Sequence, residues 1–443
     1  MAPQTSRIGL GEDILAVKKP HFFYGWKIVG ISFVTLAIAY GIWYSFSVFF
    51  VVILSEFGWS RAATAGVFSL FTLVHSFSGF LVGSLLDRFG ARRVIPAGSV
   101  LIVLGLVLTS QIQSLWQLYL YYGVVTAVGI CSIGFISHSI FLPNWFFKKR
   151  GLAMGAAMAG IGVGMQIIVP VTQSVIANIG WRPACWLLAG IVITIVVPLN
   201  AIVQRKNPEE IGELPDGERK VIAPENLKEE NSPSDNVFHI PFVWTLHNSF
   251  RTRQFRFLCL TFFFTAFAIQ GILIHQVVHI IDKGFSPQQG AFFFGLSGIF
   301  GSVGKIFFGH LSDQIGRNRA FSISIGCTFF GVLSLAVLQS GYGWLLYTYA
   351  ILFGLGYGSI APIYPARVAD LFQGPEFGKI YGLISIAGGL GGALGAWLYG
   401  KIFDLTLTYT MAFIVVMLGL VLILVLFYFT VPSSLQEVNS TES

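Results

Sequence analysis

The chain has 443 residues, of which 55% are hydrophobic and 11% are charged, whereas an ordinary soluble domain is about 25% charged. Its mean hydropathy of +0.75 excludes a single soluble core, because so much apolar surface needs the lipid bilayer as its solvent. The net charge of +7 would suit a nucleic-acid partner, but the positions of the charges, described below, argue against one.

Twelve apolar runs follow one another along the chain, each near the roughly 20 residues that cross a bilayer as a helix. In the first half we expect helices at Tyr24–Phe49, Ala62–Leu86, Val94–Ser110, Leu115–Leu142, Gly151–Ala177 and Pro183–Val203. In the second half we expect them at Phe257–Ile281, Gln289–Leu311, Ala320–Gln339, Gly343–Leu371, Ile380–Phe403 and Tyr409–Thr430. This pattern predicts an all-α polytopic membrane protein with 12 transmembrane helices.

Polar segments divide the runs into two groups of six. We expect residues 1–23 to form a cytoplasmic leader, residues 24–203 the first six-helix bundle and residues 257–431 the second. Residues 204–256, rich in proline and charge, are predicted to be a cytoplasmic linker with a short interfacial helix within Phe238–Phe250. Residues 432–443 are expected to be a cytoplasmic tail.

The charges are distributed unevenly between the two sides of the membrane. Of the 27 lysines and arginines, 22 fall on segments assigned to the side of the N-terminus. The others are Arg61, Arg182, Lys283 and Lys401 on the opposite side and Lys305 within a span. An excess of positive charge marks the cytoplasmic side. We therefore expect an integral protein of the inner or plasma membrane, monomeric, with both termini in the cytoplasm.

No pattern of catalytic or metal-binding residues is found in the sequence. The four cysteines lie inside apolar runs without metal-ligand spacing. The glycine-rich stretches lie within spans, where a nucleotide cannot reach them. We expect no metal, no cofactor and no enzymatic activity, and keep a non-transporting membrane sensor or enzyme as the alternative from another functional class.

One charged connector is repeated half a chain length later. Gly83–Arg93 and Gly309–Arg319 each lie between two apolar runs, which predicts an internal duplication. Glycine permits a tight turn, an aspartate is favoured near a helix N-terminus, and arginines mark one membrane face.

Both connectors resemble the signature loop of the major facilitator superfamily, G-x-L-x-D-R-x-G-R-K-x. The first agrees at Gly83, Leu85, Asp87, Arg88, Gly90 and Arg92. The second agrees at Gly309, Leu311, Asp313, Gly316 and Arg317, with Gln314 in place of the first arginine. The resemblance implies two pseudo-symmetric six-helix bundles with a binding site between them. It also implies that these loop residues act in conformational change.

Glycine-rich stretches are duplicated as well, at Ala159–Gly164 and Ala387–Gly392. Closely spaced glycines allow close helix contact, which is needed where two bundles rock against each other. Ordinary close packing without movement is the alternative.

The start of the fifth span, Trp145–Gly160, resembles the corresponding motif of monocarboxylate porters and oxalate–formate antiporters, as do Phe23–Trp26 and Ser47–Phe50. This resemblance implies alternating-access symport or antiport of a small organic anion, a monocarboxylate, with protons as candidate coupling ion. A drug or sugar porter is the alternative. Tyr44 and Gly301 stand where monocarboxylate porters carry a lysine and an aspartate, and Lys305 stands in place of their arginine. These departures argue against strict lactate–proton symport.

Lys305 is the principal candidate for binding the anion. It lies eight residues before Asp313, about 12 Å along a helix, where a charge costs about 2.5–3.5 kcal/mol or more. A desolvated carboxylate needs a cation partner, and pairing with a structural carboxylate is the alternative. Further substrate contacts are expected from His275, Gln270, Tyr40, Tyr44 and Tyr364.

Other ionisable residues within spans are weighed in the same way. His75, His138 and His279 are candidates for a proton relay because imidazole titrates near neutral pH, although a lone histidine is more often a packing residue. Arg367 and Asp370, one helical turn apart, are expected to form a gate or a structural pair.

Overall fold

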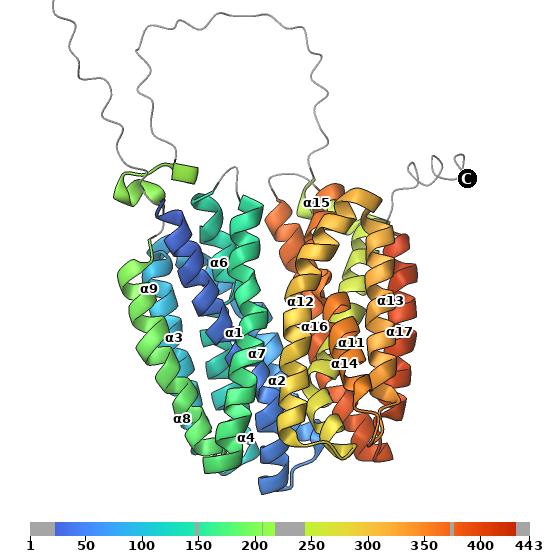
Figure 1. Ribbon diagram of the computed structural model, residues 1–443. Coiled ribbons are helices and arrows are strands. Elements are labelled where there is room, and N and C mark those ends of the chain that lie inside the picture. The colour runs from blue at the N-terminus through green and yellow to red at the C-terminus, as the bar shows by residue number, and fades with distance from the viewer. Residues whose placement is uncertain (1–22, 147–149, 206, 218–243, 373–375, 431–443) are drawn as a thin grey trace, which may run out of the picture.

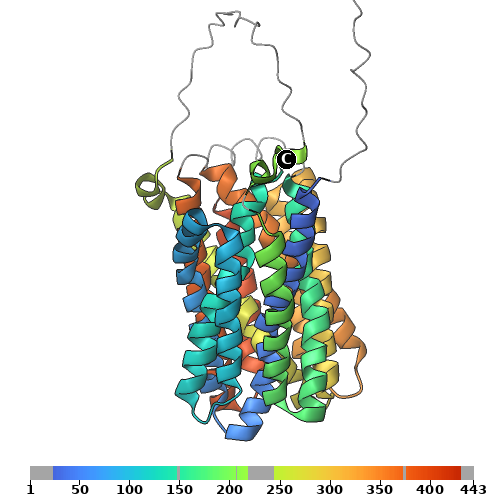
Figure 2. The same ribbon diagram turned by 90° about the vertical axis from the view of Figure 1, so that its left-hand side faces the viewer.

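The computed structural model describes residues 23–146, 150–205, 207–217, 244–372 and 376–430. Nearly all of the predicted leader, about half of the predicted linker and the whole predicted tail lie outside these ranges. Within them, 12 helices are long and apolar enough to cross a membrane, which confirms the predicted fold class. They stand side by side in one bundle, as Figures 1 and 2 show from two directions.

The helices of the first half are α1 (Gly25–Phe57), α2 (Arg61–Phe89), α3 (Ala91–Thr109), α4 (Leu115–Leu118), η1 (Tyr119–Thr126), α5 (Ala127–Ile133), α6 (Phe135–Phe141), α7 (Arg150–Ile179), α8 (Trp181–Ile191), η3 (Val192–Val196) and α9 (Val197–Val203). Those of the second half are α11 (Arg253–Asp282), α12 (Pro287–Ile315), α13 (Arg317–Ala336), α14 (Trp344–Gly358), α15 (Ile360–Leu371), α16 (Phe377–Thr406) and α17 (Thr410–Tyr428). Short helices at the connections are η2 (Leu142–Asn144), η4 (Pro208–Ile211), η5 (Pro215–Gly217) and α10 (Leu246–Phe250).

The helices extend beyond the predicted apolar runs because polar residues cap them. Ser286 accepts a hydrogen bond from the Gln289 amide at 3.2 Å and begins α12. Thr252 does the same for Phe255 at 3.2 Å and begins α11. Such side chains satisfy the free amides of the first turn, so a helix begins before its first apolar residue.

The two halves lie next to each other, the first in blue to green and the second in yellow to red (Figure 1). Residues 207–217 and α10 lie at one end of the bundle, which we call the linker end. The turn between α1 and α2 lies at the opposite end, which we call the Arg61 end. Helix α10 is held by the Glu376 carboxylate, which accepts from the Leu246 amide at 2.7 Å. Its hydrogen bonds from Lys379 and Leu246 keep the pKa of Glu376 below its ordinary value.

Equivalent helix pairs within each half are in backbone contact. A Cβ atom added at Gly164 of α7 would lie 1.9 Å from the Ala37 carbonyl oxygen of α1. One added at Gly391 of α16 would lie 2.0 Å from the Phe263 carbonyl oxygen of α11. Real side chains do not approach this closely, so α1–α7 and α11–α16 pack only because these positions are glycine. The duplicated glycine stretches therefore hold each half together.

We expect Gly164→Ala to destabilise the protein by about 1–3 kcal/mol, because α7 must move away from α1. The matched control is Gly155→Ala on the same helix, where an added Cβ meets nothing within 4 Å. Thermal unfolding of the purified variants in one detergent should show a lower midpoint for Gly164→Ala only. Equal midpoints would show that the α1–α7 contact is not tight.

Candidate functional site

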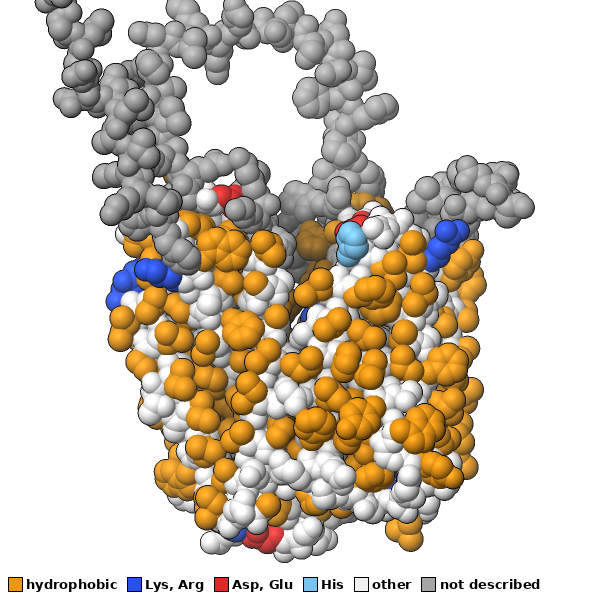
Figure 3. Space-filling model, viewed as in Figure 1, with side chains coloured by type: hydrophobic (Ala, Val, Ile, Leu, Met, Phe, Trp, Pro, Cys, Tyr) orange, Lys and Arg blue, Asp and Glu red, His pale blue; other side chains and the backbone are white. Residues whose placement is uncertain are grey.

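The candidate site lies where the two halves meet, a region that we call the interface. There α1 lies against α11, α2 against α16 and α7 against α12. Toward the Arg61 end the halves touch closely, since the Ser69 hydroxyl of α2 donates to the Ala393 carbonyl of α16 at 2.6 Å. At the linker end the surface is hollowed between the halves, and Lys or Arg surface is visible inside the hollow (Figure 3).

Lys305 on α12 is a half-buried cation without a partner. Its ammonium group has neither a hydrogen bond nor an ion pair with any residue that the structure describes, so the alternative role, pairing with a structural carboxylate, has no partner among them. One turn earlier, a Cβ added at Gly301 would lie 2.7 Å from the Tyr357 hydroxyl. Ser302, beside Gly301, faces α7, since a Cβ added at Gly162 would lie 2.2 Å from the Ser302 hydroxyl. Lys305 is thus carried by a segment of α12 that packs against both α7 and α14.

Aromatic side chains of α1 form a wall of the interface. Tyr40 stacks on Trp43 with ring centroids 5.7 Å apart, and Trp43 meets the His75 ring edge-on at 4.8 Å. Tyr44 crosses to the other half, where its ring meets Phe294 of α12 edge-on at 5.7 Å. The predicted residues Tyr40, Tyr44 and His75 therefore belong to one cluster.

Several buried polar atoms in this region have no hydrogen-bond partner within the described ranges. They are Trp43 Nε1, His75 Nε2, Gln166 Oε1, Gln270 Oε1 and Ser302 Oγ. Gln166 of α7 lies against α12, because a Cβ added at Gly295 would be 2.8 Å from its Oε1 atom. Burying such a group unpaired costs about 1–3 kcal/mol. Their gathering at the interface is what a site for a polar ligand requires.

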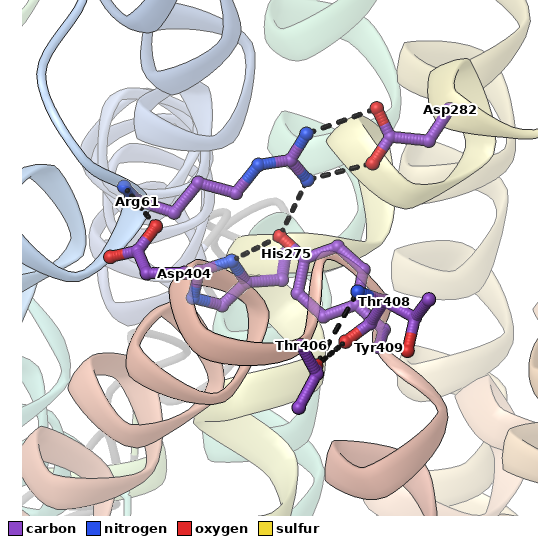
Figure 4. A network of polar contacts seen from close by, with 7 residues as sticks. All are labelled: Arg61, His275, Asp282, Asp404, Thr406, Thr408 and Tyr409. Atoms are coloured by element: carbon purple, nitrogen blue, oxygen red, sulfur yellow. Dashed lines mark hydrogen bonds and ion pairs between the residues drawn. The ribbon is translucent and has the colours of Figure 1, made fainter.

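Arg61 closes the opposite end of the interface (Figure 4). Its guanidinium binds both carboxylate oxygens of Asp282 at 2.7 and 3.0 Å and donates to the Tyr409 hydroxyl at 2.9 Å. The Asp404 carboxylate of α16 accepts from the amides of Arg61 and Ala62, each at 2.9 Å. A side chain of the second half thus caps the first turn of α2, where negative charge is favoured. We call these contacts the Arg61 network.

His275 belongs to the Arg61 network and not to the surroundings of Lys305. Its Nε2 atom lies 2.9 Å from the Ala396 carbonyl oxygen, and its Nδ1 atom lies 2.9 Å from the Tyr409 hydroxyl. Because a carbonyl only accepts, Nε2 carries the proton and Nδ1 accepts from Tyr409. Both ring nitrogens of His275, which was predicted to contact the substrate, are therefore hydrogen-bonded to protein groups.

The other predicted histidines do not form a chain of hydrogen bonds. His279 Nε2 lies 3.0 Å from the Leu335 carbonyl oxygen, and His138 Nδ1 lies 2.9 Å from the carbonyl oxygen of Gly134. His275 and His279 share Tyr409 as a ring neighbour, whereas His75 contacts Trp43. No hydrogen bond joins one histidine to another in the described part of the chain.

Three predicted residues near the linker end have structural partners. Tyr364 is fully buried and its hydroxyl lies 2.6 Å from that of Thr265 on α11. The expected pair of Arg367 with Asp370 is not formed. Arg367 instead donates to Asn318, and Asp370 accepts from Arg317 at 3.3 Å, so each binds one of two adjacent residues in the first turn of α13.

The two signature loops have the same backbone. Gly90 and Gly316 take φ values of 77° and 86° and ψ values of 159° and 153°, a conformation that favours glycine. In the second loop Arg317 donates to Asp313 and to Ser312. The side chain of Asp87 lies outside the described part of the structure. Gly309, at the start of the second loop, packs against α15, since a Cβ added at Gly309 would lie 3.4 Å from Pro362.

We did not predict the Arg61 network from the sequence, although the sequence contains a signal for it. Arg61, Asp282 and Asp404 are charged residues that each end or begin a span on the same predicted side. Gln166 and Ser302 were also missed, because a single polar residue in an apolar run is usually a packing residue. Across the described residues, no group of three or more His, Cys, Asp or Glu is placed to hold a metal ion.

Comparisons with known proteins agree with this architecture. The sequence model of the Major Facilitator Superfamily matches residues 32–396 and 302–443. Monocarboxylate transporter 13 of Rattus norvegicus is 28% identical over 396 residues, covering 88% of this chain and 85% of the relative. Monocarboxylate transporter 2 of Homo sapiens is 26% identical over 393 residues, covering 86% of this chain and 80% of that protein.

Two solved structures share the fold at low sequence identity. A bacterial homologue of the human lysosomal transporter Spinster, in an inward-facing and occupied conformation, has a TM-score of 0.68 and 14% identity, covering 93% of this chain and 97% of its own. The nucleoside transporter NupG has a TM-score of 0.69 and 11% identity, covering 92% of this chain and 100% of its own. The family match spans most of the chain, and its named relatives are transporters, not enzymes. The protein is therefore an integral membrane protein of the major facilitator superfamily.

Proposed function

We propose that this protein is a secondary active transporter of a small organic anion, a monocarboxylate, and works by alternating access. The observation that carries the proposal is Lys305, a cation in a span at the interface that has no ion-pair partner among the described residues. The names of the relatives support the substrate class. His75, whose Nε2 atom is unpaired in the same cluster, is the proposed proton carrier if protons are the coupling ion.

The surroundings of Lys305 favour a singly charged ligand. Lysine is a compact point charge that suits one carboxylate, without the two-pronged geometry of arginine. Tyr357 and Ser302 lie on the same stretch of the interface and offer neutral hydroxyl groups. A second carboxylate would need a second cation, because an unpaired charge is costly to desolvate. The unpaired amides of Gln166 and Gln270 favour a neutral polar substrate, such as a sugar, as the second candidate.

The two ends of the interface support an inward-facing state. The Arg61 network closes one end, and the surface is hollowed at the other (Figure 3). The distribution of lysine and arginine supports a cytoplasmic linker end, with both chain termini on that side. Transport then requires the Arg61 network to open while the signature loops bring the linker ends of the halves together.

We expect Lys305→Gln to abolish saturable monocarboxylate uptake at low substrate concentration. A lysine–carboxylate pair at 4 Å and an effective dielectric near 20 gains about 4 kcal/mol, and loss of half of that weakens binding more than tenfold. Lys305→Arg should keep part of the uptake because the charge persists. The measurement is uptake of radiolabelled acids, sugars and nucleosides by proteoliposomes.

The matched control for this test is Lys401→Gln, an exposed lysine of α16 near the Arg61 end, which should transport normally. Normal acid uptake by a folded Lys305→Gln protein would rule out the ligand role of Lys305. Saturable sugar uptake by the unaltered protein, with no acid uptake, would favour the second candidate.

We expect Arg61→Gln to open the Arg61 end more often. Loss of a hydrogen-bonded charge pair of about 1.5 kcal/mol shifts the equilibrium roughly tenfold. A cysteine in place of Ser69, in a background without the native cysteines, should then react about tenfold faster with an impermeant thiol reagent.

The control variant is Arg182→Gln. Arg182 pairs with Glu56 at 2.7 Å, on the same side of the membrane but within the first half, so its loss should leave the rate unchanged. Equal rates in both variants would show that Arg61 does not hold the halves together.

We also expect the linker end to face the cytoplasm. In intact cells, an impermeant thiol reagent should label a cysteine at position 283 and spare one at position 209, which reacts only after the cells are opened. Labelling of position 209 in intact cells would reverse the proposed orientation.

A further inference from the structure

A second polar site lies away from the interface, at the linker end of the first half. It is a cavity of about 470 Å³, formed by the loop between α2 and α3, the end of α9 and η4. Its lining residues are Arg88, Phe89, Gly90, Arg92, Arg93 and Ala201, together with Glu210. The volume is within the range of pockets that bind small ligands.

The arginines of this cavity form no ion pair with any carboxylate whose side chain the structure describes, a set that does not include Asp87. Arg92 Nε donates to the Ala201 carbonyl at 2.8 Å, which leaves its terminal nitrogens available. The Arg88 guanidinium lies over the Phe89 ring at 5.1 Å. Arg93 is exposed and forms no hydrogen bond or ion pair with the side chains that the structure describes. Three positive charges therefore share a cavity whose described lining contains one carboxylate, that of Glu210.

These charges do not serve the fold in an evident way. Arg92 and Arg93 lie in the first turn of α3, where the helix dipole disfavours positive charge. In the second signature loop, by contrast, Arg317 is neutralised by Asp313 and Asp370 at the surface. In the first loop the described side chains place arginines, and no such pair, around the cavity.

The cavity lies at the level expected for lipid headgroups. Lys and Arg side chains gather beside α3 and α9 at the linker end, directly above a hydrophobic surface (Figure 3). On that surface Val100 and Leu104 of α3 are 50% and 47% exposed, and Ile202 of α9 is 66% exposed. Apolar side chains at this exposure face acyl chains when the protein is in a bilayer.

We propose that this cavity binds the phosphate headgroup of an acidic phospholipid. Guanidinium groups match phosphate oxygens with paired hydrogen bonds, and acidic lipids are enriched on the cytoplasmic face, where basic segments are attracted to them. Exposed Phe89 in the lining and Ile202 beside it give the acyl chains an apolar contact that free phosphate would not use.

The test titrates the purified full-length protein in neutral detergent with phosphatidylglycerol or phosphatidylcholine and measures bound lipid by native mass spectrometry. Phosphatidylglycerol should bind more tightly. Arg93→Gln should weaken its binding about fivefold, the effect of one basic residue near an acidic lipid, and Arg93→Lys should keep most of it. Glu210→Gln should act in the opposite direction and tighten binding.

The matched control is Arg319→Gln, the equivalent position of the second loop, which lines no part of this cavity and should bind phosphatidylglycerol normally. The proposal is wrong if phosphatidylglycerol binds no better than phosphatidylcholine, or if Arg93→Gln and Arg319→Gln lose the same affinity. Displacement of the lipid by an equal concentration of inorganic phosphate would assign the cavity to free phosphate and overturn the lipid assignment.

Discussion

The backbone contact between α1 and α7, and its counterpart between α11 and α16, is the constraint on which both halves depend. Lipid provides no hydrophobic force to press helices together, so helices associate through packing at short distance. Gly160 and Gly164 of α7, four residues apart, bring α7 onto the carbonyl oxygens of α1 at two successive turns. Each contact of the interface includes a helix of these two pairs, so their spacing determines where Gln166 and Gln270 stand and where α7 meets the segment of α12 that carries Lys305.

The two ends of the interface differ in how well their polar groups are satisfied. In the Arg61 network the guanidinium of Arg61, the hydroxyl of Tyr409 and the ring of His275 all form hydrogen bonds with protein groups (Figure 4). Near Lys305 the buried amide oxygen of Gln166 and the hydroxyl of Ser302 lack hydrogen-bond partners among the described residues. Since an unpaired buried polar group raises the free energy of a conformation, the two ends are suited to different tasks. The first suits closure, and the second suits recognition of a ligand.

The duplicated loops share their backbone, and their described arginines have different neighbours. The same positive φ at Gly90 and Gly316 makes the same turn between two spans. Yet Arg317 is bound by carboxylates of the second half, whereas the arginines of the first loop line an open cavity. The two equivalent loops therefore have different neighbours. For the first loop, the proposed neighbour is the headgroup of an acidic phospholipid.

The sequence by itself determined the twelve spans, the duplication and the depth of Lys305 in its span, because hydropathy and the φ of a loop glycine are local properties. Only the tertiary structure decided which side chains meet. His275 finds Tyr409 134 residues away, and Arg61 finds Asp282 221 residues away, because each pairing depends on how a helix is rotated and which half it faces. The pairs Tyr364–Thr265 and Asp370–Arg317 depend on helix rotation in the same way. Hydropathy determines that a helix crosses the membrane, but it does not determine which neighbour each face of the helix contacts.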